Sequence, residues 1–173
     1  MRYESQAGYG VNGMRICTVV CHRVAMRFLK GGDTNVLTIE AVHAIMMQSV
    51  AFYQSTSFPP KFMGMHDVLR LLPSPSLEFG GLIRGGPDYE ADGVFVMPLT
   101  SVLHRIRHRE GKTPVALVVT FLEHTIVFLS MGKGALYLFD PLPAELLDVS
   151  ESWEAPNEGA EPYSAVMLCE AAR

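Results

Sequence analysis

Residues 124–140 read HTIVFLSMGKGALYLFD, two apolar runs that flank Gly132 and Gly134, with His124 at one end and Asp140 at the other. Apolar runs joined by glycines predict an antiparallel β-hairpin. If the hairpin turns about Gly132, it pairs residues whose numbers sum to about 264, so His124 is expected opposite Asp140 on one sheet face. Opposed side chains lie about 5 Å apart at Cβ. At that distance a carboxylate can hold an imidazole in one tautomer, which predicts an oriented base for a nucleophile.

Cys17 is the predicted nucleophile. It begins an expected amphipathic helix over 17–30, in which apolar residues recur at helical spacing. Backbone N–H groups and the helix dipole favour a thiolate at that position. The hypothesis is a papain-like thiol hydrolase with Cys17, His124 as base and Asp140 as orienter. The competing interpretation is that Cys17 is a small buried hydrophobic residue, as we expect for Cys21 on the same stripe.

Gln6 completes the predicted site. It precedes Cys17 across the glycine-rich segment 8–13 and can donate its side-chain amide to an oxyanion, assisted by the backbone N–H of Cys17. His104 and His108 have the spacing of two metal ligands on a helix, but no Glu lies between them and no third ligand suggests itself. We therefore expect a solvated helix face there, and neither a metal nor a cofactor.

The composition fits one soluble globular domain over residues 1–173. Of these residues, 49% are apolar and 18% are charged, enough to bury a core without disulfides. The net charge of −4 and the absence of a basic run argue against nucleic acid as a partner. No stretch approaches ~18 uninterrupted apolar residues, and the first residues do not resemble a secretory signal, so no membrane partner is expected. Three cysteines without such a signal indicate a reducing, intracellular compartment.

The order of predicted elements indicates an α+β chain. Helices are expected first, and strands dominate the second half, which predicts helices packed on a central, mainly antiparallel sheet. Segments rich in Pro and Gly are expected to form loops over 55–64 and 73–92. The predicted helices cover 17–30, 38–53, 62–72 and 98–109, and the predicted strands cover 77–83, 115–121, 125–129, 135–139 and 163–168.

An ordered set of short motifs runs through most of the chain. In sequence order they are Cys17 at a helix start, Gly31-Gly32, VLTIEA at 36–41, ADG at 91–93, ALVVT at 116–120 and LYLFDP at 136–141. With these motifs the chain resembles the N-terminal deubiquitinase domain of the herpesvirus large tegument protein and related viral-tegument-like deubiquitinases.

The resemblance implies a papain-like cysteine protease fold and deubiquitinase activity. The substrate would be ubiquitin or a ubiquitin-like modifier such as NEDD8, cleaved after its C-terminal Gly-Gly, with no cofactor. It also implies a host cytoplasmic and nuclear location, or the virion tegument for a viral protein. Cys17 matches the nucleophile of the family.

One departure from the family leaves the function open. The family usually ends its last motif as Asp-Pro-His, with the histidine as base, whereas this chain has Leu142 at the third position. Either His124 supplies the imidazole from the neighbouring strand, or the chain is a catalytically inactive ubiquitin-binding pseudoenzyme. A third alternative is a structural adaptor domain in which Cys17 is only packed.

Overall fold

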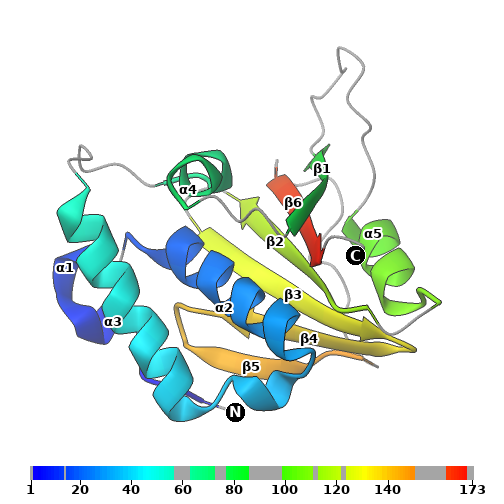
Figure 1. Ribbon diagram of the computed structural model, residues 1–173, viewed down its shortest axis with the longest axis horizontal. Coiled ribbons are helices and arrows are strands. Elements are labelled where there is room, and N and C mark those ends of the chain that lie inside the picture. Colours follow the sequence, from blue (N-terminus) through cyan, green and yellow to red (C-terminus); the bar gives the residue numbers. More distant parts are fainter. Residues whose placement is uncertain are drawn as a thin grey trace.

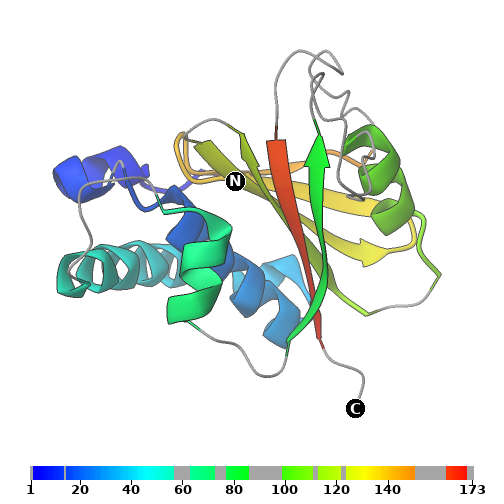
Figure 2. The same cartoon turned by 90° about the horizontal axis from the view of Figure 1, so that it is seen from above.

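The structure is a computed structural model that describes residues 2–13, 15–56, 63–72, 77–85, 99–110, 113–121, 124–150 and 163–170. Six strands form one sheet in the order β1-β6-β2-β3-β4-β5, and every neighbouring pair is antiparallel. Helices cover both faces of this sheet (Figures 1 and 2). The predicted arrangement of helices on an antiparallel sheet is confirmed. The strands are β1 (Leu77–Gly85), β2 (Val115–Phe121), β3 (His124–Gly132), β4 (Ala135–Asp140), β5 (Glu145–Asp148) and β6 (Tyr163–Glu170).

The helices lie mostly in the first half of the chain, as predicted. Two of them match their predicted bounds closely: α2 (Cys17–Gly31) and α3 (Ile39–Ser55). The side chain of Thr38 caps α3 by accepting a hydrogen bond from the N–H of Ala41 at 3.2 Å. The others are the 3₁₀ turns η1 (Gln6–Tyr9) and η2 (Thr34–Val36) and the helices α1 (Gly10–Gly13), α4 (Met65–Leu71) and α5 (Leu99–Arg107).

Two apolar clusters hold these layers together, one on each face of the sheet. The larger cluster packs α2, α3 and α4 on one face, and within it Val20, Val24 and Phe28 of α2 are fully buried. The smaller cluster packs α5 on the opposite face through Val102, Leu103 and Ile106. Because successive residues of a strand point to opposite faces, β3 contributes Val127 and Leu129 to the first cluster and Ile126 and Phe128 to the second.

The β3–β4 hairpin forms, but the predicted register was wrong by two residues. Its strands pair Val127 with Phe139 and Leu129 with Tyr137, so the numbers of paired residues sum to 266 and not to about 264. The difference begins at the turn, because the chain turns through Lys133 and Gly134, whose φ angles are 55° and 91°, and not at Gly132. Gly132 therefore pairs with Ala135, a sum of 267, and the register shift between Leu129 and Gly132 lowers the sum to 266. An offset of two residues preserves which face each side chain occupies. His124 and Asp140 are therefore diagonal neighbours on one face.

Other boundaries differ modestly from the predictions. The third helix begins at Met65, later than predicted, and β5 was not predicted at all. Parts of the predicted loops, 57–62, 73–76 and 86–92, lie outside the described residues, as does the ADG motif at 91–93. In the part of the chain that the structure describes, no helix is long and apolar enough to cross a bilayer.

Candidate active site

Cys17 is the first residue of α2, as the sequence predicted. Ile16 stands at the N-cap and offers no side-chain hydrogen bond to the first turn, and the hydrogen bond from Val20 N–H to the Ile16 carbonyl, 2.9 Å long, closes that turn. The N–H groups of the first turn have no acceptor within the helix, so they are oriented to stabilise a negative charge at this end. The side chain of Cys17 is 3% exposed.

His124 and Asp140 interact directly, as predicted. The Nε2 atom of His124 lies 3.2 Å from each carboxylate oxygen of Asp140. Both side chains are 25% exposed, so the pair is partly shielded from water but accessible from one side. Oδ1 of Asp140 also accepts the backbone N–H of Leu142 at 2.9 Å, which fixes the carboxylate. The imidazole is thereby held with Nε2 toward the carboxylate.

Two buried threonines join the helix of Cys17 to the strand of His124. The hydroxyl of Thr18 lies 2.8 Å from that of Thr125, which in turn lies 3.1 Å from the hydroxyl of Thr120. Thr18 directly follows Cys17 and Thr125 directly follows His124, so this contact holds the start of α2 beside the start of β3 (Figure 1). Neither threonine was predicted from the sequence to belong to the site, although each is a polar residue within an otherwise apolar segment.

Strand alternation defines how the candidate residues face one another. Thr125 points toward α2, where it contacts Thr18, whereas Ile126 faces the α5 side of the sheet. His124 and Asp140 share the α5 side in this alternation, while Cys17 stands on the α2 side. His124 is the first residue of β3, so its ring stands at the end of the strand that lies beside the start of α2.

Gln6 lies beside Pro141, the residue that follows Asp140. Its backbone N–H donates to the Pro141 carbonyl at 3.4 Å, and its side chain is 1% exposed. Its Oε1 atom has no hydrogen-bond partner among the described residues. The backbone of Gly13 approaches so closely that an added Cβ would lie 2.0 Å from the Gln6 carbonyl oxygen. The glycine-rich segment thus packs directly on Gln6.

Cys21 packs in the core, as predicted. It is fully buried, and its Sγ donates to the Thr125 carbonyl at 3.2 Å. Burial raises the pKa of the Cys21 thiol well above its ordinary value, and the charges of Cys17 and Asp140 raise it further. A thiol in this environment stays protonated and unreactive.

No metal centre is formed by the residues that the structure describes. They contain no group of three His, Cys, Asp or Glu side chains arranged to hold an ion. His104 and His108 are exposed on α5, with ring centroids 4.5 Å apart. This agrees with the solvated helix face that the sequence predicted.

The comparisons with known proteins are informative at the level of structure. No protein-family model matches the sequence, and no curated protein matches it. Among solved structures, the fold is similar to the ubiquitin-specific protease encoded by murine cytomegalovirus tegument protein M48, solved in complex with a ubiquitin-based suicide substrate. The two share 17% sequence identity with a TM-score of 0.70, over 96% of this chain and 82% of that chain. The chain therefore has the papain-like α+β fold of this viral protease.

Proposed function

We propose that this protein is a cysteine protease that releases ubiquitin or a ubiquitin-like modifier by cleaving after its C-terminal Gly-Gly. The observation that carries the proposal is the His124–Asp140 pair, which the Thr18–Thr125 contact holds at the end of α2 that bears Cys17. A nucleophile at a helix start with an oriented base is the arrangement that thiol hydrolysis requires. The similar fold of a viral protease solved with a ubiquitin-based substrate supports the choice of modifier.

The proposed mechanism uses side chains and backbone N–H groups of this chain, together with water. His124 takes the thiol proton of Cys17 through Nδ1, because Nε2 faces Asp140, and the sulfur attacks the carbonyl carbon of the terminal glycine. The side-chain amide of Gln6 and the first N–H groups of α2 hold the oxyanion. His124 then returns the proton to the leaving lysine amine as the C–N bond breaks. Water, deprotonated by His124, hydrolyses the thioester and restores the thiol.

The test is the reaction of the protein with ubiquitin that carries a C-terminal propargylamide. We expect an adduct by intact mass with the wild type, none with Cys17→Ala, and labelling slowed at least about tenfold with His124→Ala. Cys21→Ala is the matched control, because it removes the neighbouring thiol of the same helix, and it should label normally. Labelling that survives Cys17→Ala but is lost with Cys21→Ala would refute the assignment. A parallel reaction with NEDD8-propargylamide reports modifier preference.

A second candidate function is a ubiquitin-binding pseudoenzyme. Two observations favour it: Leu142 replaces the histidine of the resembled family, and strand alternation sets His124 on the opposite side of the sheet from Thr125 and α2. This candidate predicts that the wild type forms no adduct but still binds unmodified ubiquitin, measured by chemical-shift changes in labelled ubiquitin. If the protein forms no adduct and binds no ubiquitin, the interpretation as a structural adaptor domain remains.

A further inference from the structure

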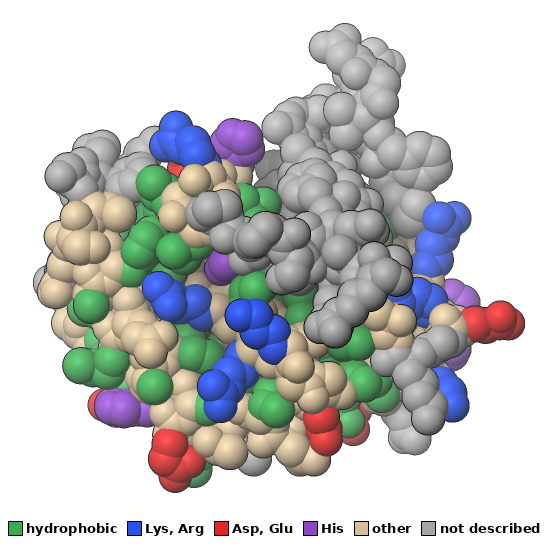
Figure 3. All heavy atoms as spheres, viewed as in Figure 1, with side chains coloured by type: hydrophobic (Ala, Val, Ile, Leu, Met, Phe, Trp, Pro, Cys, Tyr) green, Lys and Arg blue, Asp and Glu red, His purple; other side chains and the backbone are tan. Residues whose placement is uncertain are grey.

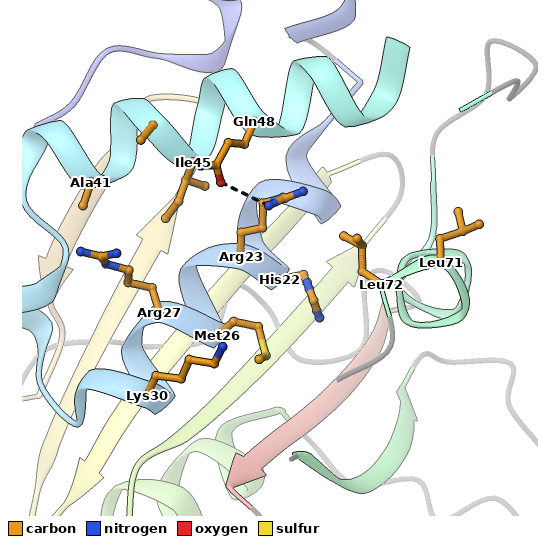
Figure 4. Close-up of a pocket in the computed structure, with 11 residues that line it drawn as sticks. His22, Arg23, Met26, Arg27, Lys30, Ala41, Ile45, Gln48, Leu71 and Leu72 are labelled. Atoms are coloured by element: carbon orange, nitrogen blue, oxygen red, sulfur yellow. Dashed lines mark hydrogen bonds between the residues drawn. The ribbon is translucent and has the colours of Figure 1, made fainter. Parts of the chain in front are cut away.

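An open groove of about 500 Å³ lies on the outer side of the helical layer, between α2, α3 and α4. It is distinct from the candidate active site, because its α2 residues follow the first turn and point away from the sheet (Figure 4). Its volume is within the range of ordinary ligand sites. Two features of its lining indicate what it binds: its charge, and a buried histidine that has no hydrogen-bond partner among the described residues.

The first feature is a row of three cations along α2. Arg23, Arg27 and Lys30 all line the groove, and none of the described residues that line it is acidic. Basic side chains are prominent over α2 on this face of the molecule (Figure 3). Among the described residues, no carboxylate forms an ion pair with any of the three. Arg23 and Arg27 are held by neutral partners, Nη1 of Arg23 by Oε1 of Gln48 at 3.3 Å and Nε of Arg27 by the Val36 carbonyl at 3.2 Å.

The second feature is His22, which lines the same groove. Its side chain is 3% exposed, and neither ring nitrogen has a hydrogen-bond partner among the described residues. Burial, with a smaller contribution from the charge of Arg23, lowers its pKa to about 4. The ring is therefore neutral at pH 7 and offers one donor and one acceptor. Buried polar groups are normally paired, so these two nitrogens call for a ligand with complementary groups. The Nε atom of Arg23 is also buried without a partner among the described residues.

Apolar side chains contribute most of the remaining lining. Met26 comes from α2, Ile45 from α3, and Leu71 and Leu72 from the end of α4, so three helices supply apolar lining (Figure 4). Arg23 and Lys30 are seven residues apart, which corresponds to about 10 Å along the helix. A single phosphate is too small to reach the whole row. It also offers mainly acceptors, whereas a peptide group offers one donor and one acceptor, as neutral His22 does.

We propose that this groove binds an acidic peptide segment of a partner protein. Carboxylates of the segment pair with Arg23, Arg27 and Lys30, apolar side chains pack against Met26, Ile45 and Leu72, and a main-chain peptide group pairs with His22. This is the charge complementarity that selects partners at protein surfaces. The proposal is independent of catalysis, because it uses no residue of the candidate active site.

The test uses a fluorescein-labelled synthetic peptide of about twelve residues, with Glu at i, i+4 and i+7 and Leu on the other side. Fluorescence anisotropy should show saturable binding to the full chain. The variant Arg27→Glu with Lys30→Glu, both exposed positions, should bind at least about tenfold more weakly. Its matched control is Arg105→Glu with Lys133→Glu, two exposed cations elsewhere that give the same change of net charge. The control should change affinity less than about twofold.

Three results would overturn the proposal. If both double variants weaken peptide binding equally, the attraction comes from the net charge of the protein and not from this groove. If a peptide with Gln in place of Glu binds equally well, the groove does not recognise carboxylates. Displacement of the peptide by inorganic phosphate, but not by chloride at equal ionic strength, would assign a phosphate site instead. Circular dichroism confirms that each variant is folded. Imidazole NMR signals of His22, identified with His22→Leu, should shift when the peptide binds and report occupancy of this groove directly.

Discussion

Leu142 occupies the position at which the deubiquitinases that this sequence resembles carry their histidine. Its side chain is 39% exposed, and its backbone N–H donates to Oδ1 of Asp140 at 2.9 Å. An imidazole at this position would start beside the carboxylate that orients it. If His124 is the working base, His124→Ala should lower the rate of ubiquitin release by about 10²- to 10⁴-fold. Adding Leu142→His to that variant should raise the rate of ubiquitin release again by at least about tenfold.

The measurement is cleavage of a fluorogenic C-terminal ubiquitin amide. Leu142→Asn in the His124→Ala background is the control, because it adds a polar side chain without a base. Rescue by Leu142→Asn to the same extent would show that the gain does not come from an imidazole. Unimpaired cleavage by His124→Ala alone would remove His124 from the mechanism.

Thr18 and Thr125 should be energetically coupled. Thr125→Val removes a fully buried hydroxyl and leaves that of Thr18 without this partner, so we expect a loss of about 1–3 kcal/mol in the free energy of unfolding. Thr18→Val should cost a similar amount, and the double variant less than the sum of the two, with a coupling of about 0.5–3 kcal/mol. Urea denaturation of all four proteins measures the cycle. Strict additivity would mean that the contact does not hold α2 to β3.

His22 should make the fold sensitive to acid. Its pKa is about 4 in the folded protein and ordinarily about 6.5, so between these values the unfolded chain binds the additional proton. The contribution of neutral His22 to the free energy of unfolding is therefore fully present above pH 6.5. It is lost as the pH falls toward 4, and the loss is roughly 3 kcal/mol for this group. Urea denaturation at several pH values should show that His22→Leu reduces this dependence. His66→Leu, at an exposed position, is the control and should keep it.

The β3–β4 turn is remote from the candidate site, and substitutions there test how much the turn contributes to the free energy of unfolding. Lys133 and Gly134 both have positive φ, the combination that two-residue hairpin turns require and that Asn-Gly satisfies best. Lys133→Asn should raise the free energy of unfolding by a few tenths of a kcal/mol. Gly134→Ala should lower it by about 1–2 kcal/mol, and thermal denaturation should separate the two. Stabilisation by Gly134→Ala would contradict the turn geometry.

The positions of helices and strands could be predicted from the sequence where the apolar pattern was long. They were predicted less well where contacts between elements determine the structure. Apolar periodicity located α2 and β2 because their buried faces are continuous. The parity of the hairpin also agreed with the prediction, but its register depends on two features that no local pattern indicates: the turn lies at Lys133 and Gly134, and the irregularity between Leu129 and Gly132 shifts the pairing by one residue. β5 is short and polar at both ends, so it resembles a loop. It becomes a strand only because β4 offers it an edge.

The same distinction applies to the candidate site and to the groove. Cys17, His124 and Asp140 stand at element ends, which a sequence indicates directly. Gln6 is isolated in sequence, and its position beside Pro141 depends on contacts between distant segments. His22 directly follows the buried Cys21, yet its own burial cannot be read from the helix pattern alone. Its burial arises where α2 and α4 lie together, and this is a property of the assembled layers.

Across the whole molecule, the first residues link the helical layer to the outer edge of the sheet. The backbone N–H of Tyr3 donates to the Ala144 carbonyl at 2.7 Å, and its hydroxyl donates to the Leu37 carbonyl at 2.8 Å. Its ring lies 5.9 Å from that of Phe139, between the two layers. Gln6 follows three residues later, so the position of the proposed oxyanion donor depends on this link.

Two substitutions of Tyr3 should separate its hydrogen bond from its packing. Tyr3→Phe leaves the buried Leu37 carbonyl without this donor and should cost about 1–3 kcal/mol in urea denaturation. Tyr3→Ala also opens a cavity between the layers and should cost about 3–5 kcal/mol. Because Gln6 loses its anchor, Tyr3→Ala should also slow ubiquitin cleavage under conditions where the protein remains folded. The control is Tyr9→Phe. Tyr9 is half-buried, and its hydroxyl contacts the exposed side chains of Glu4 and His43, so this variant should change stability by less than about 1 kcal/mol. Equal midpoints for Tyr3→Ala and Tyr3→Phe would show that the ring does not hold the two layers together.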